Sequence, residues 1–106
     1  MAWVYLLFAG LLEIVWAYEM KQSHGFTRLA PSAITIGAMI GSVGLLALAM
    51  RTLPLGTSYM IWTGIGAVGA FVVGIAFLGE AVSMTRIVAA AFIIVGLILM
   101  KAASPA

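Results

Sequence analysis

Residues 10–16, Gly10-Leu11-Leu12-Glu13-Ile14-Val15-Trp16, place an ionisable carboxylate within a long apolar run. If a helix starts near Ala2, a rise of about 1.5 Å per residue puts Glu13 about 17 Å along it, close to the middle of a hydrocarbon core about 30 Å thick. A charged side chain at that depth costs roughly 3 kcal/mol, and such residues usually have a function. Glu13 is therefore the first candidate binding residue. The simpler alternative is a protonated Glu13 whose hydrogen bond only supports packing.

The composition is that of a membrane protein. Of the 106 residues, 65% are hydrophobic and 8% are charged, whereas about a quarter are charged in an average soluble domain. Apolar runs separated by short turns predict an all-α membrane protein with four transmembrane helices in a single domain, residues 1–106. The expected spans are residues 2–20, 31–50, 57–78 and 84–101, with Ser83 as the N-cap of the last. Because the N-terminus lacks a basic segment, we expect the first span to stay in the mature protein and not to act as a signal peptide.

The residue content argues against several kinds of chemistry. The chain has no cysteine and one histidine, His24, so we expect no disulfide, no metal site and no cofactor. Its five Lys and Arg residues lie outside the apolar runs and suit the membrane–water boundary better than nucleic acid. One intramembrane carboxylate without a nucleophile–base pair or a metal-ligand set also argues against an enzyme.

Aromatic and hydroxyl side chains gather on helical faces that can meet Glu13. Trp16 lies three residues after Glu13, where its indole N–H can donate to the carboxylate and its ring can receive a cation. Lipid-facing packing is the alternative for Trp16. In the third span, residues at helical spacing share one face, and we interpret them as lining the site: Tyr59, Trp62, Thr63 and Gly66. Their O–H and N–H groups need acceptors at that depth, although aromatic packing on a core face is the simpler reading.

Small residues mark two further features. Ser42 lies beside a glycine seam in the second span, and the sequence leaves open whether its hydroxyl bonds to its own helix or lines the site. The run from residue 64 to residue 70 contains Gly64, Gly66 and Gly69 and no proline. Such a run can bend, which suits a hinge, or can allow close helix packing, and both readings stay open.

A single copy of the chain is predicted to be incomplete. Four helices with one buried acid cannot easily enclose a pathway that water can reach, so we expect a homodimer that brings two Glu13 side chains to one site. Lys21, Arg28 and Arg86 fall on one side of the membrane, and Arg51 and Lys101 fall on the other. This weak Lys and Arg asymmetry barely selects an orientation, so insertion both ways up is expected. Two opposed copies would form the inverted pair on which many transporters are built.

The chain resembles a known family, the small multidrug resistance transporters, and within it the guanidinium exporter subtype. The resemblance covers essentially the whole chain. Its most specific parts are three stretches, namely residues 10–16, His24-Gly25-Phe26-Thr27-Arg28-Leu29, and Trp62-Thr63-Gly64-Ile65-Gly66-Ala67-Val68-Gly69-Ala70.

This resemblance implies a proton-coupled antiporter in the bacterial inner membrane that exports guanidinium or small guanidinyl cations as an antiparallel homodimer. It implies that the paired Glu13 carboxylates bind protons and substrate in alternation, and that the residues that line the site and hold the carboxylates by hydrogen bonds are Trp16, Ser42, Tyr59 and Trp62. It also implies that the span 84–101 forms much of the dimer contact. The only partners it implies are a second copy, the cation and the lipid bilayer.

Two other functions compete with this one. The nearest is a multidrug exporter of quaternary ammonium or aromatic cations from the same family, which the run from Thr63 to Ala70 disfavours. The other is a small structural subunit of a larger membrane complex, in which Glu13 would pair with a partner's Lys or Arg. That subunit would lose stability without its partner.

Overall fold

The structure is a computed structural model that describes residues 1–103 and contains four helices in that range: α1 (Ala2–Gln22), α2 (Leu29–Ala49), α3 (Leu55–Phe77) and α4 (Met84–Ala103). Each helix has 20 to 23 residues, which corresponds to about 30–35 Å. All four are long and apolar enough to cross a membrane. The predicted all-α protein with four transmembrane helices is therefore confirmed. The last three residues of the predicted domain, 104–106, lie outside the described range.

The helix ends differ from the predicted spans by at most two residues, and local residues explain the shifts. α2 begins at Leu29, two residues earlier than predicted, because extended Arg28 precedes it and Pro31 falls within the first turn, where a missing N–H has no cost. α3 begins directly after Pro54, which is extended with φ −60° and ψ 151°. The predicted cap of α4 is confirmed, since the Arg86 backbone N–H donates to Ser83 Oγ over 3.2 Å.

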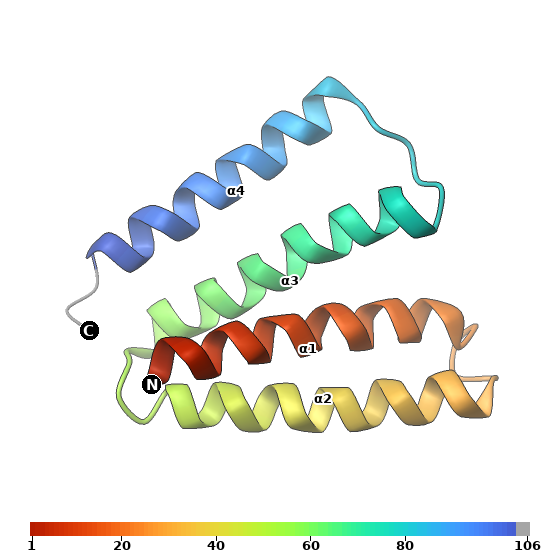
Figure 1. Cartoon of the computed structure of the whole chain (residues 1–106), viewed down its shortest axis with the longest axis horizontal. Coiled ribbons are helices and arrows are strands. Elements are labelled where there is room, and N and C mark those ends of the chain that lie inside the picture. Colours follow the sequence, from red (N-terminus) through yellow and green to blue (C-terminus); the bar gives the residue numbers. More distant parts are fainter. Residues whose placement is uncertain (104–106) are drawn as a thin grey trace.

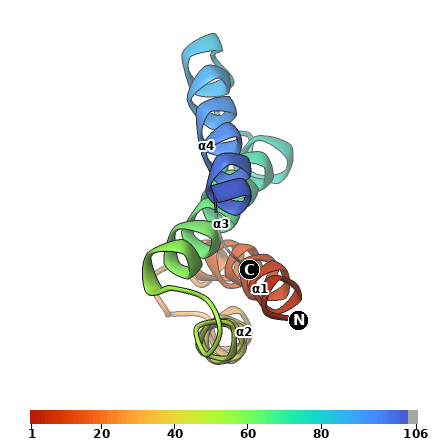
Figure 2. The same cartoon turned by 90° about the vertical axis from the view of Figure 1, so that its left-hand side faces the viewer.

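The helices lie in a row in the order α2, α1, α3, α4 (Figure 1). The row is thin, with principal extents of 42 × 34 × 16 Å, and the view along it shows α4 furthest from α2 (Figure 2). α3 contacts each of the other three helices, whereas the backbone of α4 approaches α3 alone. Both broad faces of the row are therefore open within residues 1–103.

The buried core lies between α1, α2 and the start of α3. Its apolar members are Leu6, Ala9, Leu46, Ala49, Leu53 and Ile61. In contrast, α4 has no buried residue, and its Phe92 is 73% exposed. The first three helices thus form one packed unit to which α4 is attached on one side.

Glycines set how closely α1 and α3 approach. A Cβ atom at Gly10 of α1 would lie under 3.0 Å from Ile65 of α3, and a Cβ atom at Gly69 of α3 would meet Ile14 of α1 in the same way. Each helix therefore inserts a side chain against a glycine of the other, which is the close approach that small residues allow in membranes.

Candidate functional site

Glu13 lies near the middle of α1 and its carboxyl group rests against α3. A Cβ atom at Gly66 would lie under 3.0 Å from the Oε1, Cδ and Cγ atoms of Glu13. Gly66 therefore provides the space that the carboxyl group occupies. Oε1 is buried, and no hydrogen-bond partner for it lies within residues 1–103. A buried acceptor without a donor is costly, so this oxygen is chemically incomplete in the single chain.

A chain of hydrogen bonds joins three helices one turn away from Glu13. The indole Nε1 of Trp62 on α3 donates to Ser42 Oγ on α2 over 2.9 Å, and Ser42 Oγ donates to the backbone carbonyl of Ala9 on α1 over 2.6 Å. In an α-helix that carbonyl also faces the backbone N–H of residue 13. Ser42 is fully buried, so this chain of bonds fixes α2 and α3 against the backbone that carries Glu13.

The hydrogen bonds of Ser42 differ from both possibilities that the sequence left open. Its hydroxyl bonds across to α1 and neither back to α2 nor to the Glu13 carboxylate. The contact is possible because Ala9 and Gly10 are both buried and small, which leaves the Ala9 carbonyl accessible to a neighbouring helix.

Trp16 lies one turn beyond Glu13 and has an unused donor. Its Nε1 atom is buried and makes no hydrogen bond to any residue of the described range. The donation from Trp16 to Glu13 that the spacing allowed is therefore not made in this structure. A donor and an acceptor on neighbouring turns of one helix are both without partners, and a ligand between them would complete both.

The remaining candidate residues on α3 do not all point to the same neighbours. Some pack against α1 and α2, and the others line a cavity beside α4. Trp62 and Gly66 face α2 and α1, through Ser42 and Glu13. Tyr59 and Thr63 are exposed and line a cavity of about 490 Å³ between α3 and α4. The Tyr59 and Trp62 rings still meet at the boundary, with centroids 5.5 Å apart and planes inclined by 55°. The structure therefore brings Trp62 and Gly66, but not Thr63, to the surroundings of Glu13.

The glycines of the predicted hinge each accommodate a neighbouring side chain. Gly64 meets Leu97 of α4, Gly66 meets Glu13, and Gly69 meets Ile14. α3 is a continuous helix through all three positions. The structure gives each glycine a packing role, and bending at these positions stays a prediction.

A buried hydroxyl without a hydrogen-bond partner was not identified from the sequence. Ser58 on α3 is fully buried, and its Oγ has no hydrogen-bond partner within residues 1–103. It lies four residues before Trp62 and so shares a helical face with it. That spacing was the available signal. No group of three His, Asp or Glu side chains in the described range could hold a metal ion.

Four helices of membrane length around one mid-span carboxylate with an incomplete hydrogen-bond set are the features of a small transporter of the membrane. Comparison with known proteins agrees. The family described as "Small Multidrug Resistance protein" matches residues 1–98, and the chain belongs to this family.

Individual relatives cover nearly the whole chain. The chain is 57% identical over 101 residues to a protein of Citrobacter freundii named "Guanidinium exporter", covering 95% of this chain and 96% of the relative. It is 56% identical over 104 residues to a protein of the same name from Yersinia pseudotuberculosis, covering 98% of this chain and all of the relative. The chain is thus a multi-pass transporter of the bacterial inner membrane and not an enzyme.

Proposed function

We propose that the chain exports guanidinium or small guanidinyl cations in exchange for protons, and that the two Glu13 carboxylates of an antiparallel homodimer bind the two kinds of cargo in turn. The names of the relatives support the substrate class. The single observation that carries the proposed site is the buried Oε1 atom of Glu13, which has no donor within residues 1–103. A proton or a cation would supply the missing partner.

The chemistry of the carboxylate suits this substrate. Guanidinium is planar, positively charged and rich in N–H donors, so a carboxylate can accept two parallel charge-assisted hydrogen bonds from it. The Trp16 ring lies one turn away and can add a cation–π attraction. Protons and guanidinium compete for the same oxygens, so binding of one releases the other. An inward proton gradient can then drive export of the cation.

The openness of the single chain supports the dimer. The row of helices is 16 Å thick, and the polar groups around Glu13 are not enclosed by a fourth helix, since the backbone of α4 approaches that of α3 alone. A second copy packed against a broad face of the row would enclose the polar groups around Glu13. It would also bring a second carboxylate to the site. The nearly balanced distribution of Lys and Arg residues between the two ends favours two opposed copies.

Transport by reconstituted protein tests the proposed substrate and its coupling. Guanidinium is added outside liposomes that contain the wild-type protein, and the pH of their lumen is followed with an internal dye. If guanidinium enters in exchange for protons, the lumen should become more alkaline. Glu13→Gln removes the charge but keeps the shape, and should abolish the response. Glu19→Gln, on the same helix but in its last turn, is the matched control and should retain it.

Two results would overturn the proposed function. Coupled guanidinium transport by Glu13→Gln would remove the carboxylate from the mechanism. A response to quaternary ammonium ions with none to guanidinium would favour the multidrug alternative. The Tyr59–Trp62 ring pair could then bind the cation through its aromatic faces.

Orientation is tested separately. The chain has no cysteine, so His24→Cys introduces a unique thiol into the first loop. In an antiparallel dimer this thiol should react with impermeant maleimide from both sides of the membrane in equal amounts. Reaction from one side alone would contradict opposed copies.

A further inference from the structure

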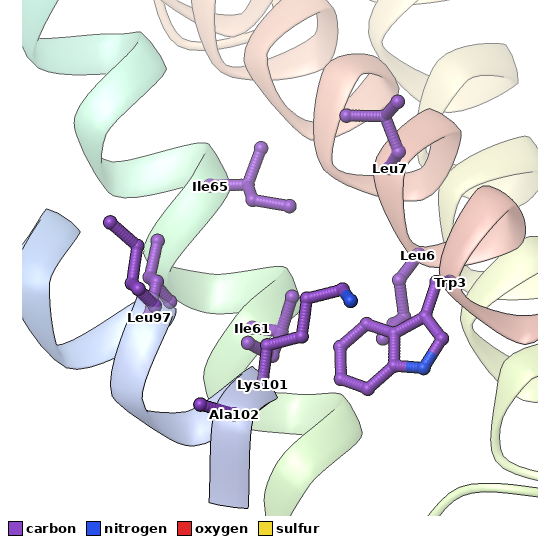
Figure 3. A pocket seen from close by; sticks show the side chains of 9 residues that line it. Trp3, Leu6, Leu7, Ile61, Ile65, Leu97, Lys101 and Ala102 are labelled. Carbon is purple, nitrogen blue, oxygen red and sulfur yellow. The ribbon is translucent and has the colours of Figure 1, made fainter. Parts of the chain in front are cut away.

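An open apolar groove of about 560 Å³ lies away from Glu13, between α1, α3 and the end of α4. Figure 3 shows its wall, formed by Leu6, Ile61, Ile65 and Leu97, with Trp3 and Lys101 at one end. Apart from Lys101, every lining side chain is aromatic or aliphatic. The volume is within the range of about 300–1,000 Å³ that is typical of ligand pockets.

Lys101 gives this groove a charged end. It belongs to the last turn of α4, and its Nζ atom lies 5.0 Å from the centroid of the Trp3 ring, as Figure 3 shows. Trp and Lys at the ends of membrane helices lie at the level of the lipid headgroups. The groove therefore runs from the headgroup level into the apolar part of the membrane.

The charged side chains at this end of residues 1–103 are all positive. The ends of α4 and α1 that carry Lys101 and Trp3 lie at the same end of the row as the turn between α2 and α3, which carries Arg51 (Figure 1). The chain has three acidic side chains. Glu13 lies at mid-span, and the other two belong to the opposite end of the helices, in the last turn of α1 and the turn after α3. Within residues 1–103, Lys101 therefore has no acidic side chain near it.

We propose that the groove is a binding site for an anionic phospholipid, with an acyl chain against the aliphatic wall and the phosphate group on the Lys101 ammonium. An apolar channel with one cation at headgroup level complements a molecule with an apolar chain and one negative charge. Basic pockets between transmembrane helices bind anionic lipids by this combination. The proposal does not depend on proton coupling or on the cargo of Glu13.

Native mass spectrometry of the purified protein tests this site. The protein is presented with phosphatidylglycerol and phosphatidylcholine of identical acyl chains, and the lipid bound per protein chain is counted. Wild-type protein should prefer phosphatidylglycerol. Lys101→Gln should reduce that preference about fivefold, the factor that one basic residue near an anionic lipid surface contributes. Lys101→Arg should retain it, which separates charge from folding.

Two further variants make the test specific. Arg51→Gln removes a charge at the same end but outside the groove and should leave the preference unchanged. Ala102→Trp fills the groove and should reduce binding of both lipids. Equal effects of Arg51→Gln and Lys101→Gln would overturn the proposal, because the preference would then come from surface charge in general. A change in dimerisation by Ala102→Trp without a change in bound lipid would also overturn it, and would assign the groove to a second copy.

Discussion

Replacement of Gly66 by alanine should impair function with little loss of stability. The new Cβ atom would lie under 3.0 Å from the Oε1, Cδ and Cγ atoms of Glu13. These atoms form the far end of a flexible side chain, so Glu13 can rotate away at a cost of about 0.5–1.5 kcal/mol for a strained rotamer. The higher helix propensity of alanine offsets this by at most about 1 kcal/mol. The net change in the free energy of unfolding should therefore be within about 1 kcal/mol of zero, whereas the carboxylate is moved from its site.

Gly10→Ala is the matched control for this prediction. A Cβ atom there would meet the Cβ and Cγ2 atoms of Ile65 under 3.0 Å, and a Cβ atom cannot rotate away from its own backbone. Overpacking of this kind costs about 1–3 kcal/mol, so Gly10→Ala should destabilise the protein more than Gly66→Ala.

The two variants are compared in detergent micelles and in liposomes. Stability is measured by unfolding with dodecyl sulfate, followed by tryptophan fluorescence, and function by guanidinium-driven pH change. We expect Gly66→Ala to unfold close to wild type but to transport poorly. Unfolding of Gly66→Ala as early as Gly10→Ala, or wild-type transport by Gly66→Ala, would refute the placement of the Glu13 carboxyl group on Gly66.

Two predictions concern stability alone. Ser42→Ala removes the acceptor of Trp62 and the donor to Ala9, and should lower the free energy of unfolding by about 1–3 kcal/mol. Trp62→Phe removes one of these hydrogen bonds and should lower it by less. Additive effects in the double variant would contradict a connected chain of bonds. Ser83→Ala removes the cap of α4 and should cost about 0.5–2 kcal/mol in the same unfolding assay, while Ser83→Asp should retain the cap. An unchanged free energy of unfolding in Ser83→Ala would show that the Ser83 hydroxyl does not stabilise the helix.

The four spans could be predicted from the sequence because the membrane makes hydrophobic length a direct signal. The ends could be predicted less well. The second span was predicted to start at residue 31, which is a proline, but a proline is accommodated anywhere in the first turn, so α2 begins at Leu29. Ser83 was a clearer signal, because a serine directly before an apolar run has one common role.

The surroundings of Glu13 could be predicted only in part. A helical wheel placed Tyr59, Trp62, Thr63 and Gly66 on one face, but it cannot say where one neighbouring helix ends and the next begins. In the structure that boundary divides the face, so that Trp62 turns to Ser42 and Thr63 lines the cavity toward α4. The acceptor of Ser42 is a backbone carbonyl 33 residues earlier in the chain, and a backbone acceptor leaves no mark in the residue types.

The place of α3 in the row also determines how movement can pass through the molecule. Within residues 1–103 it is the one helix whose backbone approaches all three others. Gly66 receives the carboxyl group from α1, and Gly64, two residues earlier, receives Leu97 from α4. A displacement of the carboxyl group and a displacement of α4 therefore act on the same turn of backbone. If Glu13 binds the proposed cargo, a shift of its carboxyl group would press on the turn of α3 that also packs against α4.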